Sequence, residues 1–259
     1  MYSDIANDGK LSEELANLQT LIDSNRAGGT SQCLYTDFRL FDTRGGLHTS
    51  DLVIVAADTS QGKSTLAISL TVNMALRGTP CIIYSMEMQA RQLAARILAS
   101  RTGISSTTLL YAQIGQEQYS HVQEQAQKIQ SLPIYFDDRS TSTIEKIISS
   151  IRIYVKKKQI KVAVIDYIQI LGTIQSVRNL EQFYGDVSRK LKNLAKELDI
   201  CIIALSQLNR DKDNPEPSLA RLRASGQIAE AADTVVLIYR PEVYGKAYKH
   251  SKADPKGTA

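Results

Sequence analysis

The chain has 259 residues, a length that suits one α/β domain with an appendage. Its composition, 43% hydrophobic and 22% charged residues, excludes an intrinsically disordered chain and is typical of a globular protein. The formal charge of +4 permits a local basic surface but does not by itself indicate a nucleic-acid partner. No stretch approaches the roughly 18 consecutive apolar residues of a membrane span, and MYSDIANDGK lacks the features of a secretion signal. We therefore expect a cytoplasmic protein, or its equivalent in an organelle matrix or stroma, with no membrane partner.

An amphipathic helix is predicted near the start of the chain. Leu11, Leu15, Leu18 and Ile22 recur at steps of four, three and four residues, which places them on one helix face. Such an apolar stripe packs either on the body of the same chain or on another subunit, and both interpretations stay open.

Six short apolar runs predict the strands of one sheet. Most are separated by helical patterns, and this alternation predicts a mostly parallel, twisted sheet flanked by helices. The clearest helix covers 179–199, and we interpret its basic face as solvated, with contact to nucleic acid as the alternative. The polar, Pro-containing stretch 211–226 predicts a long surface loop that enters a helix. The apolar runs are 52–57, 81–86, 133–136, 162–166, 201–206 and 234–239.

The strongest chemical signal directly follows the first of these runs. Residues 57–64, ADTSQGKS, match the phosphate-loop pattern G-x-x-x-x-G-K-[ST], except that Ala57 replaces the first glycine. A helix that begins at Lys63 would let backbone N–H groups and the helix dipole cradle phosphates. Lys63 would reach the β- and γ-phosphates, and the Ser64 hydroxyl would ligate magnesium. The predicted nucleotide site therefore comprises Ser60, Gln61, Gly62, Lys63, Ser64 and Thr65.

Polar residues that follow three other strands are expected at the same edge of the sheet. Asp166, after the run VAVI, would be the second magnesium anchor beside Ser64. Tyr167 follows it where many phosphate-loop ATPases have an acid, so Glu87 becomes the best-placed catalytic base. The alternative for Glu87 is a glutamate that stabilises the start of the next helix. The amide of Gln207 would hydrogen-bond the γ-phosphate or the attacking water.

These segments resemble the RecA-like ATPase domain of DnaB-type replicative DNA helicases. The resemblance rests on GGLHTSDLVIVAA, SMEM, VIDY, ALSQLNR and LRASGQIAEAADTVVLIYR, in this order around the GKS loop, and covers nearly all of 11–245. That family also has alanine in place of the first loop glycine. The resemblance implies a linker helix and connector at 1–30, a RecA-like phosphate-loop NTPase domain at 31–245 and a truncated C-terminal tail at 246–259.

The function implied by the resemblance is that of a ring-forming motor. It would use ATP and Mg²⁺, bound at subunit interfaces, to translocate on single-stranded DNA, and would form a hexameric homo-oligomer through the linker helix. Primase or a helicase loader would be further partners. Among the site residues, Glu87 matches the catalytic glutamate, Gln207 the γ-phosphate sensor, and Arg96 an arginine that packs on adenine. An ordinary helix-surface arginine is the alternative for Arg96.

The segment LRASGQI matches the loop with which that family holds DNA phosphates. It suggests Arg223, Ser225 and Gly226 as DNA-binding residues, because an arginine beside a small-residue turn offers a charged fork and close backbone donors. The alternative is a plain helix start, and Ala224 stands where the family usually has an acid.

The end of the chain departs from the family pattern. It stops at SKADPKGTA, where the family carries a strand with basic finger residues, so we expect nucleotide binding with weak turnover. The chain is then either a fragment or a naturally shortened relative. Two other functions stay open: a hydrolysis-deficient, nucleotide-binding partner of a helicase ring, and a RadA-like recombination ATPase.

Overall fold

The computed structural model describes residues 10–26, 33–43, 45–139, 143–166, 168, 180–209, 211, 214–222 and 225–247, with only the backbone of Asn25, Ser225 and Gly226. Within these ranges, no helix has both the length and the apolar character needed to cross a membrane.

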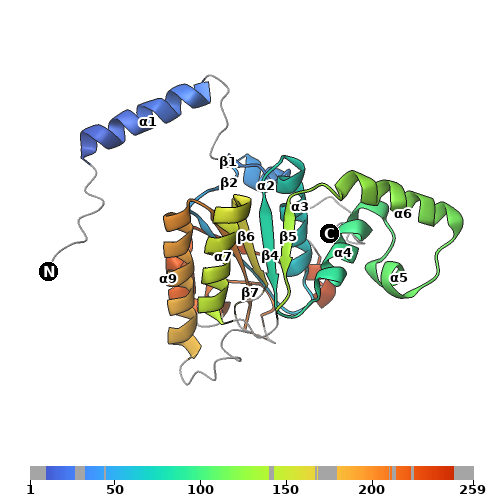
Figure 1. Cartoon of the computed structure of the whole chain (residues 1–259). Helices are drawn as coiled ribbons and strands as arrows, with labels where there is room; N and C mark the ends of the chain where they lie inside the picture. Colours follow the sequence, from blue (N-terminus) through green and yellow to red (C-terminus); the bar gives the residue numbers. More distant parts are fainter. Residues whose placement is uncertain are drawn as a thin grey trace.

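A six-stranded parallel sheet forms the centre of the molecule (Figure 1). Its order is β5-β4-β6-β7-β3-β8, and all six predicted strands are confirmed within two residues of their expected bounds. A separate antiparallel pair, β1 (Cys33–Leu34) and β2 (Leu47–His48), precedes it. The strands of the parallel sheet are β3 (Leu52–Ala57), β4 (Cys81–Ser85), β5 (Ile134–Asp137), β6 (Val162–Asp166), β7 (Cys201–Gln207) and β8 (Thr234–Leu237).

Helices cover both faces of the parallel sheet, so its central strands are buried on both sides and read as nearly continuous apolar runs. On one face, Ile54 and Ala56 of β3 join a core cluster with α7 (Ile144–Lys158), α9 (Leu180–Leu198) and α10 (Ser225–Ala231). On the other face, Val53 and Val55 join a cluster with α2 (Arg39–Asp42), α3 (Lys63–Leu76) and α4 (Ala90–Thr102). Beyond α4 lie α5 (Ser106–Tyr111) and α6 (Gln116–Ile129) (Figure 1).

The predicted first helix is present as α1 (Leu11–Arg26), and Figure 1 shows it clear of the sheet. Its apolar stripe is solvent-exposed: Leu11 is 75% exposed, Leu15 54%, Leu18 50% and Ile22 42%. Among the described residues, none covers this stripe, so the interpretation that it packs on the body of the same chain has no support in the structure.

The segment before α10 differs from its prediction. A surface loop was expected through 211–226, but a 3₁₀ turn η1 (Leu219–Arg221) and a bridge between Leu208 and Leu222 end it in the core. Arg221 is 7% exposed and Leu222 is 0% exposed. The prediction is wrong here because the charge of the buried Arg221 is compensated by the carboxylate of Asp58, which is distant in the sequence. A second 3₁₀ turn, η2 (Pro241–Tyr244), follows β8.

Candidate nucleotide site

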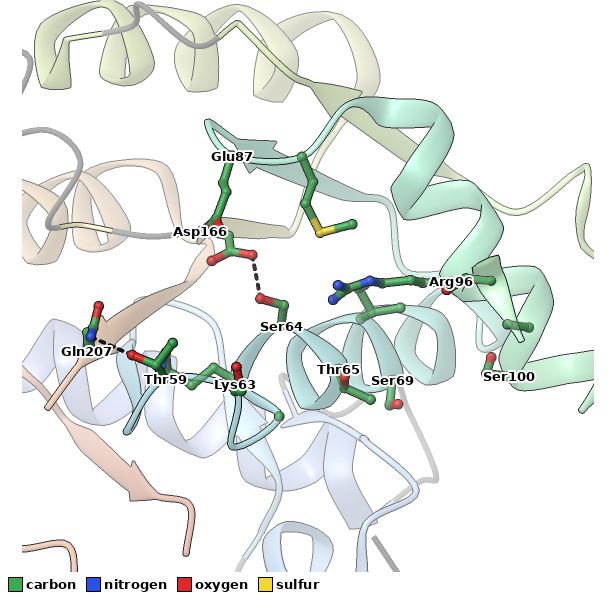
Figure 2. Close-up of a pocket in the computed structure, with 16 residues that line it drawn as sticks. Thr59, Lys63, Ser64, Thr65, Ser69, Glu87, Arg96, Ser100, Asp166 and Gln207 are labelled. Atoms are coloured by element: carbon green, nitrogen blue, oxygen red, sulfur yellow. Dashed lines mark hydrogen bonds between the residues drawn. The ribbon is translucent and has the colours of Figure 1, made fainter. Parts of the chain in front are cut away.

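The phosphate loop joins β3 to α3 through two left-handed backbone positions. Ser60 has φ +62° and Gly62 has φ +98°, and at Gly62 the residue is the glycine that this backbone region favours. The helix α3 begins at Lys63, as predicted, so the N–H groups of its first turn are free of intrahelical partners and face the loop. Beside this turn lies a pocket of about 710 Å³ (Figure 2).

Lys63 lies at the base of this pocket. Its Nζ donates hydrogen bonds to the carbonyl oxygens of Ala57, at 2.9 Å, and Asp58, at 3.1 Å. Burial lowers the pKa of the Lys63 ammonium, against the opposing effect of the nearby carboxylates of Asp166, Asp58 and Glu87. A bound anion would stabilise the charged form, so this position suits a phosphate.

Ser64 and Asp166 meet in the pocket at the predicted magnesium position. Ser64 Oγ donates to Asp166 Oδ2 at 2.7 Å (Figure 2). Asp166 is 6% exposed, and its burial raises the pKa of its carboxyl, an effect to which the charge of Glu87 adds. The hydrogen bond from Ser64 and the charges of Lys63 and Arg96 oppose this shift. A hydroxyl and a carboxylate are ligands that Mg²⁺ accepts, and a cation here would favour the ionised carboxylate, so the residues fit this ion.

The two other predicted polar residues of the sheet edge also line the pocket. Glu87 follows β4, is exposed, and its side chain descends toward Asp166 (Figure 2). Gln207 ends β7, and its Nε2 donates to Thr59 Oγ1 at 2.7 Å. The pocket therefore brings together residues from three different strand ends. The contribution of Thr59 was not predicted, because its hydroxyl becomes relevant only through the distant Gln207.

Arg96 and Gln61 both belong to the predicted nucleotide site, but only the side chain of Arg96 lines the pocket. Arg96 points from α4 across the pocket toward Ser64 (Figure 2), and its proposed packing on adenine stays a prediction. The side chain of Gln61 does not line the pocket: it is 5% exposed, and its Nε2 donates to the Tyr244 hydroxyl at 3.4 Å. Gln61 can therefore face a nucleotide only through its backbone. Ser60, Gly62, Ser64 and Thr65 do line the pocket.

The predicted DNA-binding residues are only partly described. Arg223 lies outside the described residues, whereas Ser225 and Gly226 form the first turn of α10. Their contact with DNA stays a prediction.

The basic face of α9 is engaged in ion pairs. Arg189 pairs with Asp186, Lys190 with Glu145, and Lys192 with Asp233. This pairing fits the interpretation of a solvated surface.

Comparison with protein-family models matches residues 33–257 to the DnaB-like helicase C terminal domain. The chain is 31% identical over 262 residues to the replicative DNA helicase DnaB of Rickettsia bellii (strain RML369-C), covering 95% of this chain and 52% of that protein. It is 34% identical over 252 residues to the DnaB of Buchnera aphidicola subsp. Baizongia pistaciae (strain Bp), covering 95% and 53%. The chain thus spans about half the length of the curated relatives it matches.

Two solved structures share the architecture. One, the structure of an ATPase domain, superposes with a TM-score of 0.83 at 27% identity, covering 94% of this chain and 88% of that one. The other, a DnaB-like replicative helicase solved in a study of its interactions with primase, gives a TM-score of 0.79 at 27% identity, covering 95% and 60%. The predicted RecA-like, phosphate-loop fold, a parallel sheet flanked by helices, is confirmed.

Proposed function

Because the chain belongs to the DnaB-like helicase C terminal domain family, we propose that it is the ATPase motor domain of a replicative DNA helicase. It hydrolyses ATP with Mg²⁺ at subunit interfaces and uses the energy to translocate on single-stranded DNA. The observation that supports this most directly is the 2.7 Å contact between Ser64 and Asp166 at the foot of a phosphate loop. The family assignment favours this function over a RadA-like recombination ATPase.

Each residue of the pocket has a defined role in this proposal. Lys63 leaves the carbonyl oxygens of the loop to bind phosphate oxygens, and backbone N–H groups of the α3 first turn complete the cradle. Ser64 and Asp166 hold Mg²⁺, which when bound neutralises charge on the phosphates. Glu87 accepts the proton of the attacking water, and Gln207 exchanges its bond to Thr59 for one to the γ-phosphate.

Assembly into a hexameric ring is the second part of the proposal. The exposed stripe of α1 would pack on a neighbouring subunit, because four large apolar side chains along one helix face favour burial. Single-stranded DNA would contact Arg223, Ser225 and Gly226. Primase or a helicase loader would bind the assembled ring; one structurally similar helicase was studied with primase.

The test is the steady-state ATP hydrolysis rate with and without single-stranded DNA. We expect DNA to stimulate the rate, and Glu87→Gln to lower the stimulated rate at least about 100-fold, because the proton acceptor is lost. Nucleotide affinity of Glu87→Gln, measured with a fluorescent ATP analogue, should stay close to that of the unmodified chain. Glu117→Gln, at an exposed glutamate in the first turn of α6, is the matched control and should leave the rate unchanged.

Two results would contradict the proposal. Hydrolysis by Glu87→Gln at the unmodified rate would remove Glu87 from catalysis. Nucleotide binding without hydrolysis in the unmodified chain, with or without DNA, would contradict a self-sufficient motor and favour either a fragment that needs further sequence or the hydrolysis-deficient ring partner.

A further inference from the structure

A part-buried ion pair outside the pocket joins the phosphate loop to the segment that precedes the predicted DNA contact. Arg221 Nη2 donates to both carboxylate oxygens of Asp58, at 2.9 and 3.0 Å. The side chains of Arg221 and Asp58 are 8% and 14% exposed, and neither residue lines the nucleotide pocket. The pair therefore lies behind the site, where it contacts the loop without occupying the space of a ligand.

Arg221 also organises the segment 208–222, of which the structure describes 208–209, 211 and 214–222. Its Nε and Nη2 donate to the carbonyl oxygen of Asn209, at 3.1 and 2.8 Å. Its Nη1 donates to the carbonyl oxygens of Pro215, at 2.8 Å, and Glu216, at 3.2 Å. In return, the backbone N–H of Asn209 donates to the carbonyl oxygen of Arg221 at 2.8 Å. The Arg221 guanidinium thus bonds to the start of this segment and to its middle. Its ion pair with Asp58 attaches the segment to the phosphate loop.

The same part of the phosphate loop contacts the proposed phosphate-binding lysine. Lys63 Nζ donates to the carbonyl oxygens of Ala57 and Asp58. The carbonyl oxygen of Ala57 also accepts the backbone N–H of Leu208 at 3.1 Å, and the carboxylate of Asp58 also accepts the Tyr244 hydroxyl at 2.9 Å. When Lys63 moves to a phosphate, it releases carbonyl groups of the two residues that hold the 208–222 segment.

Arg221 also lies directly before the predicted DNA-binding residues in the sequence. Leu222 follows Arg221, is 0% exposed and forms a β-bridge with Leu208. Because this backbone is packed in the core, a displacement of Arg221 would also displace the residues that follow it. Arg223 comes next in the sequence, and Ser225 begins α10. Separating the guanidinium from Asp58 would leave a buried charge uncompensated, which disfavours displacement of either segment alone.

We propose that Arg221 is a positioning residue that, through Asp58, couples occupancy of the phosphate loop to affinity for single-stranded DNA. This inference rests on the proposed function, because it assumes that both ligands bind.

The experiment compares the unmodified chain with Asp58→Asn, Asp58→Glu and Asp199→Asn. The last is the control: Asp199 pairs with Lys161 at 3.1 Å on the surface, before β7, at the opposite end of the sheet from the pocket. The measurement is the Kd for a fluorescein-labelled oligo-dT without nucleotide and with a non-hydrolysable ATP analogue and Mg²⁺. In the unmodified chain we expect the two values to differ about fivefold or more.

The variants should separate coupling from binding. Asp58→Asn, measured at saturating ATP analogue, should bring the ratio of the two Kd values close to one, because the neutral amide no longer holds the guanidinium. Asp58→Glu, which keeps the charge, should retain part of the ratio, and Asp199→Asn all of it. By thermodynamic reciprocity, DNA should change nucleotide affinity by the same factor, and Asp58→Asn should abolish that change too.

The outcomes distinguish this inference from the proposed function. A folded Asp58→Asn variant that keeps the full ratio overturns the inference and leaves the proposed function intact. An unmodified chain that binds neither nucleotide nor oligo-dT overturns the proposed function, and the coupling with it. If Asp58→Asn does not fold, hydrogen exchange of the unmodified chain decides: altered protection of 208–222 upon binding of the ATP analogue supports the coupling, and unaltered protection overturns it.

Discussion

The helices α1 and α9 both carry apolar residues at alternating steps of three and four residues, but one stripe is exposed and the other is buried. In α9, Tyr184, Val187, Leu191 and Leu194 follow one another at steps of three, four and three residues and are at most 2% exposed. The corresponding stripe of α1 is at least 42% exposed at every position. The spacing of apolar residues thus predicts a helix and its apolar face. Whether that helix stabilises the fold depends on what its apolar face contacts.

The difference arises from what each helix lies against. α9 lies beside α7 (Figure 1), and its stripe belongs to the core cluster formed with the strands of the sheet. Among the residues that the structure describes, the hydrogen bonds of α1 are local, such as that from Thr20 Oγ1 to the carbonyl oxygen of Ala16. We therefore expect equal substitutions in the two stripes to have very different effects on the free energy of unfolding.

Truncation in the α9 stripe should have the largest effect. Leu191 is 0% exposed, so Leu191→Ala removes buried methyl groups and leaves a cavity, which lowers the free energy of unfolding by about 2–5 kcal/mol. Urea denaturation followed by circular dichroism measures this change. A loss below about 1 kcal/mol would contradict the close packing of α9 on the sheet.

Adding a methyl group to α9 should have an intermediate effect. A Cβ on Gly185 would clash with Gln227 Oε1 of α10 and would lie 2.6 Å from Gln227 Cβ. Gly185→Ala therefore costs about 1–3 kcal/mol through overpacking, although alanine is the better helix former.

The added methyl group would push α10 away from α9. Because α10 begins with two of the predicted DNA-binding residues, Gly185→Ala should also weaken binding of oligo-dT. Combining it with Gln227→Ala removes the close oxygen and should restore part of the stability and part of the binding. If Gly185→Ala instead raises the free energy of unfolding, α10 does not pack closely against α9.

The sheet and the pocket could be predicted because their signals are local. The central strands are buried on both faces and therefore appear as apolar runs, and parallel strands bring their carboxyl ends to one edge. Asp166, Glu87 and Gln207 each follow such a run, so their meeting with the phosphate loop follows from topology alone.

The contacts that tie the phosphate loop to 208–222 could not be predicted in this way. Asp58 and Arg221 are separated by 163 positions, and neither belongs to an apolar run that would indicate burial. Arg221 lies in a polar, Pro-containing stretch, which sequence patterns assign to the surface. Its burial depends on a carboxylate that only the folded chain brings near, and the same holds for Thr59 and Gln207.

The α1 stripe should give the smallest change in stability and a large change in assembly. Leu15→Asp with Leu18→Asp removes no contact to the sheet, so the free energy of unfolding should change by less than about 0.5 kcal/mol. If the stripe packs on a neighbouring subunit, two buried carboxylates at the interface would be strongly unfavourable, and sedimentation velocity should show loss of the oligomer. Glu13→Gln, on the opposite face of α1, is the control and should leave assembly unchanged. Oligomers that persist in the double variant would mean that other surfaces form the ring, and that α1 differs from α9 in lacking any partner for its apolar face.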